Sequence, residues 1–231
     1  MALRFTTSDV ASRLHGVKTL VYGLAGMGKT RLVATAPTPL LISAESGLLS
    51  LREFQIPTIE ILTVDDLTDA HKWCQQSKEA AQFETICIDS ISEIGEVVLI
   101  NAKRQVKDPR QAYGELIEKM QGAIRAFRDL SGKHVYMSAK MDLVKDDQTG
   151  VTRYMPSMPG SKLGPSLPYM FDEVFRLGLG KTQQGEEFRF LQTRPDLQYD
   201  AKDRSGALDA FEPPDLSHIF TKILGATNNG T

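Results

Sequence analysis

The sequence predicts an α/β protein built on a mainly parallel central sheet with helices on both faces. Short apolar runs, which are typical of buried strands, alternate along the chain with segments of helical periodicity. The first apolar run leads into a glycine-rich loop and then into a helix. Several runs end on a polar or acidic residue, and ligands of parallel sheets gather at these carboxyl ends of the strands. We therefore expect the functional site at that edge of the sheet.

The glycine-rich loop lies in the stretch Val17–Thr30, after an expected strand at Thr19–Tyr22. Its residues GLAGMGKT fit the G-x-x-x-x-G-K-[ST] phosphate loop. Glycines let successive backbone amides turn toward a phosphate, Lys29 can reach the β/γ-phosphates, and Thr30 can offer its hydroxyl to Mg²⁺. The alternative is an ordinary glycine-rich turn before a helix. The expected nucleotide-binding residues are Gly23, Leu24, Ala25, Gly26, Met27, Gly28, Lys29, Thr30 and Arg31.

The segments after this loop complete the first half of the sheet. A helix continues over Arg31–Ala36 until the following prolines end it. A second helix, capped by Asp65 or Asp66, extends to about Ala81. The expected strands of this half are Leu40–Ala44, Ile59–Leu62 and Glu84–Asp89.

The second half combines long helices with a less regular region. A helix over Ile91–Asn101 runs into a basic, irregular stretch, and an amphipathic helix then continues to Leu130. The segment Lys140–Asp172 is rich in Gly, Pro and Ser, so we expect it to be irregular, with a hairpin at Leu143–Met155 as an alternative for part of it. An antiparallel pair then extends the sheet. The remaining expected elements are strands at Lys133–Ala139, Glu173–Leu179 and Glu187–Thr193 and a helix at Leu216–Leu224 capped by Asp215.

The overall composition is that of a protein with one substantial core and nearly balanced charge. The length of 231 residues favours one domain, which we place at residues 17–225, between a lead-in at 1–16 and a flexible tail at 226–231. The net charge of −2 argues against a generally basic nucleic-acid binder, so any contact with DNA or RNA must come from local basic segments.

The location of the protein follows from what the sequence lacks. No apolar run approaches the ~20 residues of a membrane helix, and the N-terminus has no signal-peptide core. The two cysteines, Cys74 and Cys87, have neither metal-ligand spacing nor a secretory context, and we expect both to be reduced core residues. The four histidines are scattered and do not suggest a zinc site. These features predict a cytoplasmic protein without a membrane partner.

Two carboxylates follow expected strands. Asp89 has the position of a Walker-B carboxylate, which would hold Mg²⁺ together with Thr30, and the alternative is a cap of the next helix. Glu45 could orient and deprotonate a water molecule for attack on the γ-phosphate, and the alternative is a surface glutamate that begins a helix. The N/T-K-x-D motif by which GTPases read their base is not found.

At this point the ordered motifs carry a family resemblance. The segments GLAGMGKT, LLISAESG and TICIDSISEI, followed by a long amphipathic helix and HVYMSAK, resemble the RecA-type ATPase core. The chain is most similar to small phage-encoded RecA-like ATPases that act as single-strand annealing or recombination proteins, in which a late segment similar to QTRPDLQYDAKDRSG recurs. The resemblance covers roughly Val17–Gly206 and matches Glu45 to the catalytic glutamate of that core. It implies a RecA-like fold.

The resemblance also implies roles for later residues. The fifth strand of this core lies between the phosphate-loop strand and the Walker-B strand, which would place Ser138 and Lys140 beside the γ-phosphate as sensors. The family usually has a glutamine or another polar side chain there, so Ser138 is a departure. Two DNA-binding loops would fall at about Asn101–Gln111 and Met141–Leu167, with ordinary solvated charge as the alternative. Their expected DNA-binding residues are Lys103, Arg104, Lys107, Arg110, Lys145, Arg153, Tyr154 and Lys162.

Oligomer formation is a further implication of the resemblance. Arg194, Lys202 and Arg204 are candidates for completing the ATP site of a neighbouring subunit, as an arginine finger does in trans, and the alternative is ordinary surface charge. The N-terminal portion is short for the oligomerisation domain of a recombinase, and no extra C-terminal DNA-binding domain is expected.

Together these implications predict a function. We expect a Mg²⁺-dependent, DNA-stimulated ATPase that hydrolyses ATP to ADP and phosphate. It would assemble as a ring or filament on single-stranded DNA, with a single-strand-binding protein as a further partner, and promote annealing or recombination of bacteriophage DNA in a bacterial host. One alternative is a phage NTPase for another task, such as helicase loading or packaging. The other is a nucleotide-gated DNA-binding module with little turnover.

Overall fold

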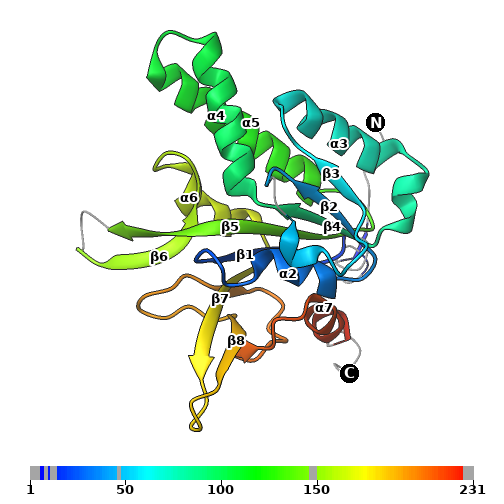
Figure 1. The fold of residues 1–231 in the computed structure, drawn as a ribbon, viewed down its shortest axis with the longest axis vertical. Coiled ribbons are helices and arrows are strands. Elements are labelled where there is room, and N and C mark those ends of the chain that lie inside the picture. Colours follow the sequence, from blue (N-terminus) through cyan, green and yellow to red (C-terminus); the bar gives the residue numbers. More distant parts are fainter. Residues whose placement is uncertain (1–5, 8–9, 11–14, 46–47, 146–149, 226–231) are drawn as a thin grey trace.

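The fold is a twisted ten-stranded sheet with helices on both faces, as the computed structural model in Figure 1 shows. The structure describes residues 6–7, 10, 15–45, 48–145 and 150–225. The strands are β1 (Lys18–Gly23), β2 (Pro39–Ser43), β3 (Thr58–Glu60), β4 (Thr85–Asp89), β5 (His134–Lys145), β6 (Thr152–Ser157), β7 (Glu173–Lys181), β8 (Glu187–Gln192), β9 (Lys202–Asp203) and β10 (Phe211–Glu212). The α-helices are α2 (Lys29–Leu32), α3 (Val64–Gln76), α4 (Ile91–Gln105), α5 (Pro109–Arg128), α6 (Leu163–Ser166) and α7 (Leu216–Gly225).

The strand order confirms the predicted fold class. The sheet runs β10-β8-β7-β1-β5-β4-β2-β3, with β6 paired to β5 and β9 paired to β7. The six strands from β7 to β3 along this order are parallel, whereas β6, β8, β9 and β10 pair antiparallel. Strand β5 lies between β1 and β4, as the RecA-like core requires. The protein therefore has a RecA-like α/β fold with an antiparallel extension toward its C-terminus.

The central strands are buried on both faces and separate two cores. Ile86 and Ile88 of β4 belong to the core that contains residues of α3, α4 and α5. Cys87, between them, belongs to the core on the side of α2 and α7, because successive side chains of a strand point to opposite faces. Cys74 and Cys87 are both free and buried, which confirms their prediction as reduced core residues.

Several predicted boundaries shift because of local hydrogen bonds. The cap of α3 is Thr63, whose hydroxyl accepts from the Asp66 amide while the Asp66 carboxylate accepts from the Thr63 amide at 2.7 Å. This reciprocal capping box displaces the predicted cap at Asp65 or Asp66 by two or three residues. The helix ends at Gln76 rather than Ala81, because Ser77 is extended and the chain enters a 3₁₀ turn.

The basic stretch predicted as an irregular loop at Asn101–Gln111 is helical apart from a short connection at 106–108. Helix α4 continues to Gln105, and α5 begins at Pro109 after its cap Asp108. Ala102 is fully buried, so this part of the stretch continues the core face of α4. The prediction of a loop is therefore wrong, because polar side chains on the outer face of α4 hid its helical period.

The segment Met141–Leu167, predicted as a second irregular loop, is also ordered. Strand β5 continues to Lys145 and pairs with β6, which confirms the alternative of a hairpin, although its turn at 146–149 lies outside the described residues. The segment then forms α6 and a 3₁₀ turn at Leu167–Met170. Together with the confirmed antiparallel pair β7–β8, this hairpin extends the sheet beyond its carboxyl edge (Figure 1).

The C-terminal helix was predicted correctly. Asp215 caps α7 by accepting from the amide of His218 at 3.0 Å, and Ile219 and Phe220 are buried. Most of the predicted lead-in and the whole predicted tail at 226–231 lie outside the described residues. Within the part of the chain that the structure describes, none of the helices has the length and apolar character needed to cross a bilayer.

Candidate nucleotide-binding site

The phosphate loop connects β1 to α2 at the carboxyl edge of the sheet. Gly26 and Gly28 have φ angles of 76° and 100°, in the left-handed region that other residues rarely adopt. A Cβ on Gly26 would meet no atom within 4 Å, so the backbone conformation and not the available space requires glycine there. The Lys29 ammonium folds back over the loop and donates to the carbonyls of Gly23 and Leu24 at 2.9 and 3.0 Å. The loop thus has the curled backbone and central cation of a phosphate cradle.

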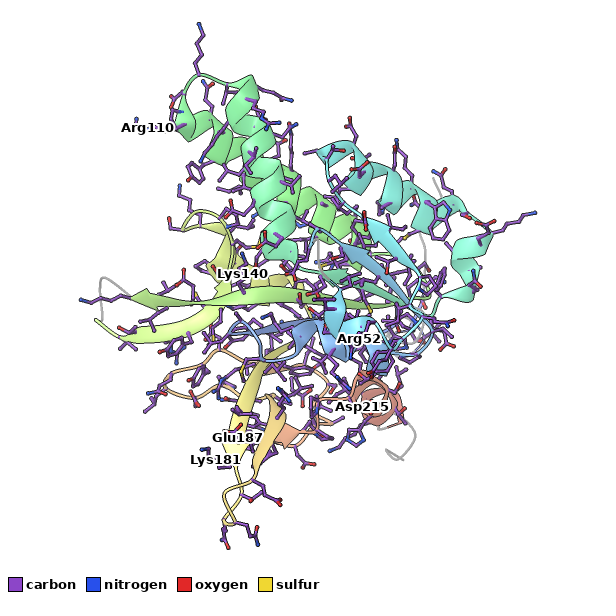
Figure 2. All side chains as sticks on the ribbon, in the orientation of Figure 1. Arg52, Arg110, Lys140, Lys181, Glu187 and Asp215 are labelled. Atoms are coloured by element: carbon purple, nitrogen blue, oxygen red, sulfur yellow. The ribbon has the colours of Figure 1, made fainter. Side chains whose placement is uncertain are left out.

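A cavity of about 470 Å³ opens in front of this loop. The ends of β1, β2 and β4 and the middle of the longer β5 supply its wall, at the edge where ligands of parallel sheets bind. Figure 2 shows Lys140, one of these residues, near the middle of the molecule on β5. The lining residues are Gly23, Leu24, Ala25, Gly26, Gly28, Lys29, Thr30, Arg31, Glu45, Ser50, Asp89, Lys140 and Met141.

Asp89 fits the predicted metal-binding role. Its carboxylate is 1 % exposed, and one oxygen accepts a hydrogen bond from the Ser138 hydroxyl. The other oxygen, Oδ2, is buried without a hydrogen-bond partner among the described residues. A buried, unpaired carboxylate oxygen that shares a cavity with the Thr30 hydroxyl suits a hard cation such as Mg²⁺. The alternative role as a helix cap belongs to Ser90, whose hydroxyl accepts from the Glu93 amide at 3.3 Å.

Glu45 lies directly after β2 and faces the same cavity. Burial raises the pKa of this carboxyl above its usual range, the nearby negative charge of Asp89 raises it further, and a hydrogen bond with Ser90 opposes the shift. Its backbone amide is held by the Ser43 hydroxyl at 3.1 Å. A half-buried carboxylate with a raised pKa is a better proton acceptor than an exposed one, which suits the role of general base.

The cationic groups of the cavity differ in their exposure, since Lys29 is half-buried and Lys140 is exposed. Burial lowers the pKa of the Lys29 ammonium, while Asp89 and Glu45 act in the opposite direction. Lys140 lines the cavity and forms an ion pair with Glu93. Ser138 is fully buried and does not reach the described cavity wall, because its hydroxyl is bound to Asp89. Of the two expected sensors, the structure therefore brings Lys140 to the cavity and places Ser138 behind Asp89.

A serine joins the start of α4 to the root of the β5–β6 hairpin. The Ser92 hydroxyl donates to the carbonyl of Ser157 at 2.7 Å and accepts from the amide of Lys140 at 2.9 Å. This residue is 3 % exposed. The first turn of α4, the cavity residue Lys140 and strand β6 are thus held together immediately beside Asp89.

The expected DNA-binding residues of the first segment lie where α4 meets α5. Lys103 and Arg104 are in the last turn of α4, Lys107 is in the connection, and Arg110 is in the first turn of α5. Figure 2 shows Arg110 at the outer end of this helical pair, away from the sheet. The Lys103 ammonium lies 5.5 Å from the centre of the Tyr113 ring. These residues form one exposed basic group, which we call the α4–α5 tip.

The expected DNA-binding residues of the second segment are separated and partly engaged. Tyr154 stacks on Tyr199 with ring centres 5.1 Å apart, so one ring face is already covered. Arg153 pairs with Asp200 at 3.3 Å. One face of the Tyr154 ring is thus taken by Tyr199, and a contact of Tyr154 with DNA stays a prediction. Lys145 and Lys162 are exposed.

The three residues expected to act in trans lie away from the described cavity. Lys202 donates to the carbonyls of Pro168 and Phe171, and Arg204 pairs with Asp172 at 2.8 Å. Arg194 is exposed and donates to the carbonyl of Leu208 at 3.5 Å. These contacts lie within one chain, so a role in a neighbouring subunit stays a prediction.

A residue that the sequence analysis missed also contacts the phosphate loop. Arg189 of β8 donates from Nε to the carbonyl of Met27 at 2.8 Å. The alternation in the segment EFRF places Arg189 on the face of the hairpin opposite to Phe188 and Phe190. The sequence shows this alternation. It does not show the strand register that brings the hairpin beside β1.

The chain is similar to a solved structure and to a protein family. A solved structure, the KaiC-like protein PH0186 from Pyrococcus horikoshii OT3, is similar at 15 % identity and a TM-score of 0.44, covering 78 % of this chain and 79 % of that chain. No curated protein matches the sequence. The AAA domain family matches residues 15–205, which include the phosphate loop, Glu45 and Asp89. The chain therefore belongs to the AAA domain family and is a P-loop ATPase, with the RecA-like fold that its strand order shows.

Proposed function

We propose that the protein couples Mg²⁺-dependent ATP hydrolysis to the binding of single-stranded DNA. We propose further that it promotes strand annealing or homologous recombination as an oligomer, in the manner of the phage RecA-like proteins that its motifs resemble. The observation that carries the hydrolytic part is the convergence of the phosphate loop, Glu45 and Asp89 on one cavity.

Each cavity residue has a distinct part in this proposal. The loop amides and Lys29 bind the phosphates, and Thr30 and Asp89 would hold Mg²⁺, which when bound neutralises phosphate charge. Glu45 orients a water molecule and accepts its proton. The Ser138 hydroxyl fixes the Asp89 carboxylate, which leaves Oδ2 as the oxygen directed to the cation.

The binding of DNA is supported by charge at the α4–α5 tip. Its four cations, Lys103, Arg104, Lys107 and Arg110, lie on a protein whose net charge is −2, so this local group would attract a phosphate backbone despite the overall negative charge. Helix α4 begins two residues after Asp89, which connects this group to the metal-binding edge. A structural change at the nucleotide site could therefore reach the tip through α4.

The decisive experiment measures ATP turnover with and without single-stranded DNA. We expect stimulation in the wild type and loss of turnover in Glu45→Gln. ATP turnover that does not change when DNA is added would support the alternative of an NTPase for another task, such as helicase loading. Nucleotide binding without turnover in the wild type would support a nucleotide-gated module. Salt-dependent binding of a fluorescent oligonucleotide tests the DNA surface separately.

A further inference from the structure

The β7–β8 hairpin carries an arginine that contacts the phosphate loop from its own chain. Phe188 and Phe190 lie over Gly180 and Gly178 on one face of the hairpin. Arg189 points to the other face, where its Nε donates to the carbonyl of Met27 at 2.8 Å. The two partners are 162 positions apart in the sequence.

The contact is on the side of the loop away from the cavity. Gly26 and Gly28, which flank Met27, line the cavity, whereas the described cavity wall includes neither Met27 nor Arg189. A phosphate cradle turns its amide N–H groups inward, so a carbonyl group that points outward needs a partner on that side. Arg189 supplies such a partner for Met27. Its Nε would lie 3.6 Å from a Cβ placed on Gly28, so it packs directly against the loop.

We propose that Arg189 is a positioning residue of the nucleotide site. By holding the Met27 carbonyl outward, it keeps the neighbouring amides directed toward the place of the phosphates before the nucleotide arrives. A loop that is already ordered loses less conformational freedom on binding, which strengthens affinity. The guanidinium also adds a fixed positive charge beside an anion site. This inference rests on the proposed binding of nucleotide at the loop.

The hairpin has enough other interactions to keep its form without Arg189. Strands β7 and β8 pair over the full length of β8, from Arg176 opposite Gln192 to Lys181 opposite Glu187. Lys181 and Glu187 also form an exposed ion pair at 3.6 Å, and Figure 2 shows both near the end of the hairpin. Loss of the Arg189 side chain should therefore alter the phosphate loop rather than unfold the hairpin.

The test is a titration of fluorescent ADP against Arg189→Ala, Arg189→Lys and the control Lys181→Ala. We expect Arg189→Ala to weaken binding about tenfold, since a charge-assisted hydrogen bond and its preorganisation are lost. Arg189→Lys retains a charged donor and should recover affinity to within about threefold of the wild type. The control should bind as the wild type does. At saturating ATP, kcat should be unchanged in Arg189→Ala, while KM rises with the dissociation constant.

Two results would overturn the inference. One is wild-type affinity in Arg189→Ala. The other is a loss of affinity that accompanies a lower melting temperature of the nucleotide-free protein, because this would show a general structural role. If the wild type binds ADP but turns over no ATP, the proposed function fails, while weaker ADP binding in Arg189→Ala would still support the role of Arg189. If the wild type binds no nucleotide at all, both fail.

Discussion

The nucleotide cavity and the α4–α5 tip are both charged, yet they are built differently. In the cavity, Asp89 is bound by Ser138, Lys29 is bound by loop carbonyls, and burial shifts the pKa of Glu45 upward. At the tip, the basic side chains lie on exposed helix ends, and Lys103 contacts one aromatic ring. Binding in the cavity thus depends on fixed geometry, whereas binding at the tip depends on the summed charge of exposed side chains. Substitutions should separate the two by their size and by their response to salt.

The largest effect is expected for Lys29→Ala. Loss of the central cation should reduce ATP turnover by more than about 100-fold, because the charge that develops on the phosphates loses its fixed partner. Steady-state phosphate release measures this. Oligonucleotide binding by the same variant sharpens the comparison. Oligonucleotide binding that persists would show that the tip binds DNA without nucleotide. ATP turnover near the wild-type rate would show that Lys29 has no part in the site.

The next effect concerns Glu45 and its dependence on pH. Glu45→Gln should lower kcat by about 10²-fold to 10³-fold with little change in nucleotide affinity, since a general base is lost. The pKa of Glu45 is raised, and the base must be ionised, so wild-type activity should increase as pH rises through that raised value. The acid limb of the kcat profile should be absent from the residual activity of the variant. Wild-type turnover in Glu45→Gln would show that another residue is the general base.

A smaller effect is expected when the α4–α5 tip loses its charge. Replacing Lys103, Arg104, Lys107 and Arg110 together by alanine should weaken binding to single-stranded DNA by about tenfold and reduce the salt slope by up to about 3. ADP affinity should not change, because the tip does not line the cavity. The control variant Lys72→Ala/Lys78→Ala removes two exposed charges, one on α3 and one shortly after it. If only overall charge matters, the control should lose about half as much binding free energy as the tip variant, because it removes half as many charges.

The smallest effect is expected for Tyr154→Leu. The stack between Tyr154 and Tyr199 should contribute about 1 kcal/mol to the free energy of unfolding, which denaturant titration measures. DNA affinity should fall by less than about twofold, because Tyr199 already covers one face of the ring. A tenfold loss of DNA affinity with unchanged stability would show that Tyr154 belongs to the DNA-binding surface.

The sequence was sufficient for the elements whose pattern is local. Strands β1 and β4 were recognised because their apolar runs end at the phosphate loop and at Asp89. The helical tip was mistaken for a loop because its exposed residues are polar, although Ala102 continues the buried stripe. Neither the stack that covers Tyr154 nor the contact of Arg189 could be predicted. Both depend on which distant segments the sheet brings side by side.

The hydrogen bonds of Ser92 have a mechanical consequence. They join the first turn of α4 to the root of the hairpin, so a displacement of either segment beside Asp89 would be passed to the other. Helix α4 has 15 residues and is therefore about 22 Å long. A tilt of about 5° at its base would displace its far end by about 2 Å, which makes the helix a lever. The occupant of the metal site would then set where the basic tip stands relative to the sheet.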